Sequence, residues 1–212
     1  MCESTSDPPL ENRLSTEFIN SLPIIRFKGP VIVIDDSTQA AEILKALSNE
    51  KILGFDTESR PSFSKGVSYP PAIIQLATKK RVYLFQLKGM GLNGDLIRFL
   101  ADSTTRKIGI GLKDDIDRLR NLQPFKPGGF IDLSKLAGQK GIIQTGARAL
   151  TARYLGHRLS KGAQTSNWAH PTLSEKQKRY AATDAWICLQ IYPRLLADHN
   201  RYPPPEEGNT TD

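Results

Sequence analysis

Ile52-Leu-Gly-Phe-Asp-Thr-Glu58 is the stretch that decides the fold class and first indicates the chemistry of this chain. Its apolar residues predict a buried strand over 52–56, and Asp56 and Glu58 stand at positions i and i+2. Both carboxylates share one face if the strand continues that far. Carboxylates that point the same way repel each other unless a cation bridges them or one is protonated. By itself the pattern is also typical of acids in surface loops.

Strand and helix signals alternate on both sides of this stretch. The predicted strands are 31–34, 52–56, 72–77, 81–85, 107–111 and 130–133, and the predicted helices follow Ser37 and cover 95–101, 114–121, 147–155 and a long segment from Ser174. Thr78-Lys-Lys80 joins two strands as a hairpin, and Ser174-Glu-Lys-Gln177 fits a capping box. A hairpin followed by alternating strands and helices predicts an α/β fold, with a mixed central β-sheet flanked by α-helices.

The polar ends of the chain bracket the region of alternating signals. We expect a flexible N-terminal tail over 1–20, one domain over 21–200 and a flexible C-terminal tail over 201–212. A length of 212 residues suits a single domain with a sizeable core.

The composition excludes several classes of protein. The longest apolar runs are far too short to span a bilayer, and no signal peptide is visible, so we expect no membrane partner. Two distant cysteines make a disulfide framework improbable and favour a reducing, cytoplasmic location. The three histidines have no ligand spacing, which argues against a zinc site.

Two further patches carry carboxylates next to apolar segments. Ile108-Gly-Ile-Gly-Leu-Lys-Asp-Asp115 ends a predicted strand, and spacing alone does not choose between Asp114 and Asp115. Both acids would also suit an ordinary helix N-terminus. Tyr180 and Asp184 are four residues apart, which places them on one face of the long helix. The surrounding residues are apolar, so a buried Asp184 would need a partner such as a cation.

The charge and the aromatic residues are compatible with a polyanionic ligand. The formal net charge is +7, and without four ligand carboxylates the remainder would carry 29 − (22 − 4) = +11. Such an excess is also common on solvated surfaces. Phe63 and Trp168 lie in polar, loop-like surroundings, where either could stack on a base, although core packing is an equal alternative for Trp168.

Taken together and in order, these motifs resemble the DEDD superfamily of 3′–5′ exonucleases. The resemblance rests on Phe55-Asp-Thr-Glu58, on the pair Ile73-Ile-Gln-Leu76 and Val82-Tyr-Leu-Phe85, on Gly109-Ile-Gly-Leu-Lys-Asp-Asp115, and on Ser166-Asn-Trp168 leading to Tyr180-Ala-Ala-Thr-Asp184. The chain looks most similar to ribonuclease D and the exonuclease domain of the Werner syndrome protein. Tyr180 matches the tyrosine-type branch, whereas the histidine-type branch would need histidine at position 179, where Arg179 stands.

The resemblance implies a ribonuclease H-like fold and metal-dependent cleavage of DNA or RNA from a free 3′ end. It assigns Asp115 rather than Asp114, and it implies that two Mg²⁺ or Mn²⁺ ions are held by Asp56, Glu58, Asp115 and Asp184. Tyr180 would orient the attacking water, and the products would be nucleoside 5′-monophosphates.

Two expectations are less direct. Arg158, Lys161 and Trp168 are candidate nucleic-acid contacts, because the two cations shortly precede the Trp168 segment. A catalytically silent nucleic-acid-binding module of the same fold is the alternative function.

Overall fold

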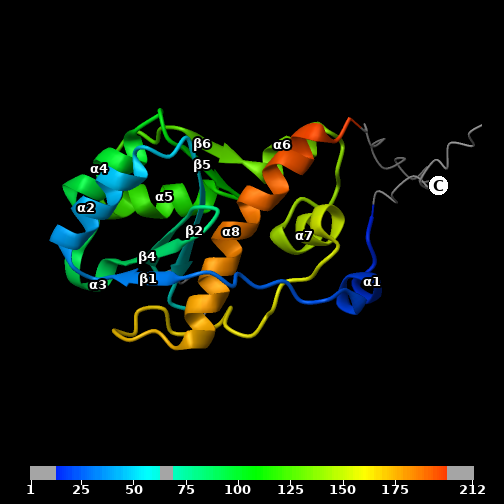
Figure 1. Ribbon diagram of the computed structural model, residues 1–212, viewed down its shortest axis with the longest axis horizontal. Helices are drawn as coiled ribbons and strands as arrows, with labels where there is room; N and C mark the ends of the chain where they lie inside the picture. The colour runs from blue at the N-terminus through cyan, green and yellow to red at the C-terminus, as the bar shows by residue number, and fades with distance from the viewer. Residues whose placement is uncertain (1–12, 63–68, 200–212) are drawn as a thin grey trace, which may run out of the picture.

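A six-stranded mixed sheet organises the computed structural model, which describes residues 13–62 and 69–199 (Figure 1). The strand order is β1-β4-β3-β2-β5-β6. β3 is antiparallel to both of its neighbours, and the other pairs are parallel. The elements are α1 Thr16–Ser21, β1 Val31–Ile34, α2 Ser37–Leu47, β2 Ile52–Ser59, β3 Pro71–Ala77, β4 Val82–Gln86, α3 Leu87–Met90, α4 Gly94–Ala101, β5 Arg106–Gly109, α5 Lys113–Leu122, β6 Phe130–Asp132, α6 Leu133–Gln139, α7 Ala147–Leu155 and α8 Glu175–Ala197. The predicted α/β class and mixed sheet are confirmed.

The two faces of the sheet are covered by different helices. Leu53 and Phe55 point from β2 into a core shared with α2, α4 and α5. The long helix α8 crosses the other face, with α6 and α7 beside it (Figure 1). β2 is therefore an interior strand with one face in each core, which explains its nearly continuous apolar first half.

Gly54 lets α8 approach β2 more closely than any other residue would allow. A Cβ atom at this position would lie 2.0 Å from the carbonyl oxygen of Ala185 on α8. Ala181, Ala182 and Ala185 are themselves small and buried at this crossing. The helix backbone therefore packs directly on the strand, two residues before Asp56.

Most predicted elements are confirmed, with differences at their ends. β2 continues through Ser59, three residues beyond the prediction, so Glu58 also lies on the strand. β5 ends at Gly109 instead of 111 because Gly111 has φ +73° and its N–H donates to the Asp132 side chain. The hairpin at Thr78 and the capping box at Ser174 are both present.

Three short helices were not predicted, and one of them corrects the expected N-terminal tail. All of α1 except its last residue lies in the segment predicted as a tail, where Ser15 caps the helix, and α1 buries Ile19 against α7. The segment is polar in composition, and this is why the burial of Ile19 was not predicted. Residues 1–12 and 200–212 lie outside the described residues. Within 13–62 and 69–199, no helix combines the length and apolar character that crossing a membrane requires.

Candidate metal centre

Three carboxylates from two elements converge at the end of β2. Asp56 and Glu58 alternate with core-facing residues of β2 and point toward the face that α8 covers. Asp184 comes from the middle of α8. Each of the three contributes a carboxylate oxygen, and these oxygens lie within 4.8 Å of one another. The structure thus brings together three of the four predicted ligands.

Tyr180 lies one helical turn before Asp184, and its hydroxyl donates a hydrogen bond to the Asp184 carboxylate. Its ring packs against Trp168, with the ring centroids 6.0 Å apart. The tyrosine is therefore fixed at both ends, by an aromatic contact along the ring and by a carboxylate at the hydroxyl.

Asp115 stands beside the cluster in a different hydrogen-bonding environment. It lies in the first turn of α5, and one of its carboxylate oxygens accepts a hydrogen bond of 2.6 Å from the Thr57 hydroxyl. It is close enough to raise the pKa of Asp56 and Glu58 by charge repulsion. Asp114, the competing candidate, is exposed, whereas Asp115 is half-buried. The geometry therefore agrees with the choice of Asp115.

Asp132, which the sequence did not single out, fixes the loop that carries Asp115. One of its carboxylate oxygens accepts N–H groups from Gly111 and Ser134 at 2.9 Å each, and the other accepts Leu112 N–H at 3.1 Å. Leu112 is the N-cap residue of α5 and has no side-chain capping bond of its own. Asp132 thus caps α6 and orients α5 from a neighbouring strand. The sequence feature that could have indicated this role is the position of Asp132 between a strand and a helix.

Gln75 is a second unpredicted polar residue beside the centre. It pairs with Asp56 across the β2–β3 ladder, so both side chains point to the same face. The side chain is fully buried, and neither amide atom has a hydrogen-bond partner among the described residues. A buried amide of this kind is costly unless something bound at the centre satisfies it.

Burial and mutual repulsion change the acidity of the whole centre. Burial first and Asp56 second raise the pKa of Glu58 to about 10, and burial raises the pKa of Asp184 to about 7. The pKa of Asp56 is raised by burial and then by Asp184. Clustered carboxylates with raised pKa values bind either protons or a cation. Oxygen donors suit Mg²⁺ or Mn²⁺, so these residues fit a divalent metal site.

The predicted nucleic-acid contacts have different outcomes. Trp168 is fully buried, which favours the core-packing alternative over a contact with nucleic acid. Its loop closes over the ring because Ala163 and Leu173 pack around it. Arg158 is half-buried and donates through Nε to the carbonyl of Leu22. Lys161 is exposed, and Phe63 falls outside the described residues.

Comparison with known proteins places this architecture in one class, the ribonuclease D-like exonucleases with a ribonuclease H-like fold. The fold resembles the crystal structure of the Aedes aegypti Nibbler EXO domain, with a TM-score of 0.73 and 23% identity over 82% of this chain and 91% of that one. It also resembles Escherichia coli RNase D, with a TM-score of 0.69 and 25% identity over 78% of this chain and 44% of that one.

Sequence comparison identifies the family. Residues 31–199 match the 3′-5′ exonuclease family model, and the chain belongs to this family. It is 31% identical over 186 residues to the mouse bifunctional 3′-5′ exonuclease/ATP-dependent helicase WRN. That match covers 83% of this chain and only 13% of the mouse protein. The chain therefore spans only a small part of the length of this relative.

Proposed function

We propose that this chain is a tyrosine-type, metal-dependent 3′–5′ exonuclease that releases nucleoside 5′-monophosphates from the 3′ end of DNA or RNA. The observation that carries the proposal is the convergence of Asp56, Glu58 and Asp184 within 4.8 Å, inside a chain of the 3′-5′ exonuclease family. Tyr180 on Asp184 supports the tyrosine-type assignment.

Asp56, Glu58 and Asp184 would bind two Mg²⁺ or Mn²⁺ ions, and Asp115 would complete the set from its position beside Thr57. When bound, two such ions activate a water and stabilise the leaving 3′ oxygen. The carboxylates also fix where the terminal phosphodiester can lie.

Tyr180 acts in this proposal as a hydrogen-bond donor. Burial, and then the negative charge of Asp184, raise the pKa of its phenol above the usual range, so the hydroxyl keeps its proton. A protonated phenol cannot serve as a general base at neutral pH. It can orient the water or a phosphate oxygen by donating a hydrogen bond.

A hollow next to the end of β2 provides room for the terminal nucleotide. This cavity of about 360 Å³ is lined by Arg60, which directly follows the last residue of β2, by Tyr69 and Lys88, and by apolar residues of other segments. The Arg60 guanidinium lies 4.8 Å from the centre of the Tyr69 ring. We propose that the base of the terminal nucleotide occupies this hollow, since a flat aromatic and cationic wall favours stacking.

The positive surface supports a polyanionic substrate. We propose that the exposed Lys161 contacts backbone phosphates. Arg158 would contribute through the guanidinium N–H groups other than Nε, which donates to the Leu22 carbonyl. These contacts and the net charge of +7 predict affinity that falls steeply with salt.

A labelled-oligonucleotide assay tests the function directly. Single-stranded DNA and RNA carrying a 5′ label are incubated with Mg²⁺, Mn²⁺ or a chelator, with Asp56→Ala as the control. We expect a metal-dependent ladder that shortens from the 3′ end, and none with Asp56→Ala. Retarded migration without cleavage would support the silent binding module instead. Undiminished cleavage by Asp56→Ala would show that the site is wrongly assigned.

A further inference from the structure

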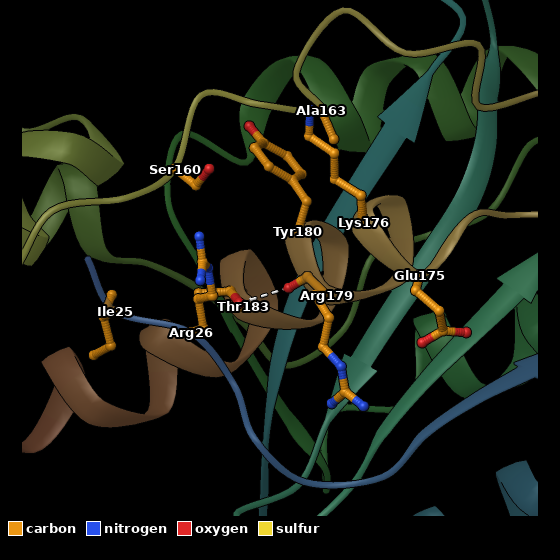
Figure 2. Close-up of a pocket in the computed structure, with 9 residues that line it drawn as sticks. All are labelled: Ile25, Arg26, Ser160, Ala163, Glu175, Lys176, Arg179, Tyr180 and Thr183. Carbon is orange, nitrogen blue, oxygen red and sulfur yellow. Dashed lines mark hydrogen bonds between the residues drawn. The ribbon is translucent and has the colours of Figure 1, made fainter.

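A second hollow shares only Tyr180 with the metal centre. This cavity of about 370 Å³ lies between the segment that precedes β1, the turn around Ser160 and the first turns of α8 (Figure 2). None of the four carboxylate ligands lines it. The Tyr180 side chain is therefore a wall between the carboxylates and this hollow.

Two cations of this hollow have no acidic partner in the described part of the chain. Arg26 and Lys176 are exposed, and neither forms an ion pair with a described carboxylate. Glu175 also lines the hollow, but it pairs with Lys178 at 2.9 Å. Arg179 points away from Tyr180 in Figure 2, and its guanidinium donates to the Gly29 carbonyl at 2.6 Å. Three cations and one carboxylate line the hollow, so it keeps an excess of positive charge, to which the unpaired Arg26 and Lys176 contribute.

The turn opposite α8 is shaped around Lys176. A Cβ atom at Gly162 would lie 2.7 Å from Cε and 3.1 Å from Nζ of Lys176, so the end of the Lys176 side chain lies directly against the backbone of this turn. The Ser160 hydroxyl accepts the Gly162 N–H at 3.3 Å and lies within the same lining. In Figure 2 the charged ends of Arg26 and Lys176 extend to the same side of α8 as the Tyr180 hydroxyl.

We propose that this hollow, which we call the Arg26–Lys176 pocket, binds a backbone phosphate of the strand whose 3′ end lies in the metal centre. The proposal rests on the exonuclease function proposed above. The clustered carboxylates repel a polyanion, and two unpaired cations one tyrosine away offset that repulsion. Arg26 supplies a planar fork that can bind two phosphate oxygens, and Lys176 supplies a point charge.

The double substitution Arg26→Gln with Lys176→Gln tests the pocket by binding. Anisotropy of a labelled single-stranded decamer, measured in chelator to prevent cleavage, should show affinity about tenfold weaker at low salt. The slope of log affinity against log salt should become shallower by about 0.7, the value for one single-strand phosphate contact. The matched control is Lys51→Gln with Arg106→Gln, which removes the same charges at the start of β2 and β5. A parental slope in the test variant, or an equal change in the control, would overturn the proposal.

Kinetics separate this proposal from the exonuclease function. The comparison substrate is thymidine 5′-(p-nitrophenyl phosphate), which has one phosphodiester and no neighbouring phosphate. With Mg²⁺, the ratio of KM for the decamer to KM for this small substrate should be about tenfold higher in the double variant than in the parent. If the parent cleaves neither substrate while the double variant loses decamer binding, the function is wrong and the pocket stands. If the parent cleaves both and the ratio of KM values stays constant, the function stands and the pocket is wrong.

Discussion

Two regions of the central sheet hold ionisable side chains away from bulk water, on opposite faces of adjacent strands. Lys107 on β5 is fully buried, and its ammonium donates to the carbonyls of Phe99, at 3.2 Å, and of Asp102 at the end of α4. It also lies near the Phe99 and Phe130 rings. Lys107 thus finds its partners inside the chain, since a cation at a helix C-terminus is favoured.

The carboxylate cluster is compensated much less, because Asp184 accepts a hydrogen bond from Tyr180 but none of the three carboxylates forms an ion pair with a cation in the described part of the chain. Asp56, Glu58 and Asp184 are placed against one another, and repulsion adds to burial in raising the pKa of Asp56 and Glu58. The close packing of α8 on β2 at Gly54 keeps the three carboxylates together despite their mutual repulsion. An internally paired charge therefore serves the fold, whereas a cluster of like charges indicates a ligand. Substitutions in the two regions test that distinction.

The largest effect is expected from Asp184→Asn, which removes one charge of the cluster and keeps an acceptor for Tyr180. Loss of a metal ligand should lower cleavage by roughly three orders of magnitude or more, corresponding to several kcal/mol. In chelator the melting temperature should stay or rise, since repulsion is relieved. Asp117→Asn on the exposed side of α5 is the control and should change neither. A destabilised but active Asp184→Asn protein would contradict the distinction.

Lys107→Met should have the opposite profile, a loss of stability with the chemistry retained. The substitution keeps the volume but removes the ammonium group that donates to both carbonyls; Phe99 O keeps the Asp102 N–H at 3.3 Å, whereas Asp102 O loses its side-chain donor, at a cost of about 1–3 kcal/mol. Urea unfolding measures this loss, and the cleavage rate well below the melting temperature should stay within about twofold. Lys45→Met, at an exposed position of α2, is the control. Loss of activity without loss of stability would show that Lys107 is more than a structural charge.

The sequence predicted the parts of the centre that rest on periodic elements. β2 and α8 carry strong apolar patterns, so periodicity alone places Asp56 and Glu58 on one face of a strand, and Tyr180 and Asp184 on one face of a helix. The choice of Asp115 needed the family resemblance, because its position depends on the contact with Thr57 from another element.

The remaining features depend on tertiary contacts that no local pattern reports. Asp132 acts on Gly111 and Leu112, about twenty residues earlier in the chain. Trp168 lies in a polar loop, and its burial follows from how that loop folds against α8 and the sheet. The short helix α1 is likewise defined by its packing on α7, which the polar composition of its segment does not reveal.

Asp132→Asn should weaken the centre without removing a ligand. An amide can still accept from Gly111 and Ser134 but presents an NH₂ group to Leu112 N–H, so the start of α5 and Asp115 should shift. Outer residues of this kind typically change metal affinity or activity about 10- to 100-fold. Mn²⁺ titration by calorimetry measures the affinity. Asp36→Asn, which alters the cap of α2, is the control and should leave Mn²⁺ affinity at the parental value. Equal metal affinity in both variants would mean that Asp132 acts only as a helix cap and does not support the metal centre.

Tyr180→Phe should have a smaller effect, confined to the rate. The ring can keep its contact with Trp168, and only the hydroxyl is lost, so metal affinity should remain close to that of the parent. One hydrogen bond worth about 1 kcal/mol corresponds to a five- to tenfold lower kcat. Single-turnover cleavage together with Mn²⁺ titration separates the two quantities. A lost metal site would mean that Tyr180 mainly positions Asp184.

The smallest expected effect is the pH dependence of stabilisation by Mg²⁺. Glu58, with a pKa of about 10, and Asp184, with a pKa of about 7, hold protons in the metal-free folded chain at pH values where the unfolded chain has lost them. Metal-free stability therefore falls as the pH rises above the unfolded values near 4. Mg²⁺ must displace the protons that remain, so its stabilising effect should grow with pH.

Between about pH 6 and pH 8, where Asp184 titrates, the gain in melting temperature from Mg²⁺ over chelator should increase by about 2–4 °C, which corresponds to about 1 kcal/mol for a chain of this size. Fluorescence-monitored melting at three pH values measures the gain. In Asp184→Asn the gain should increase less between pH 6 and pH 8, because the titrating carboxyl group at position 184 is absent. The metal-free Lys107→Met protein provides the contrast, because its lost stability lies in hydrogen bonds outside the cluster and its Mg²⁺ response should follow the parent. A gain that shrinks with rising pH would mean that the cluster binds no cation in place of its protons.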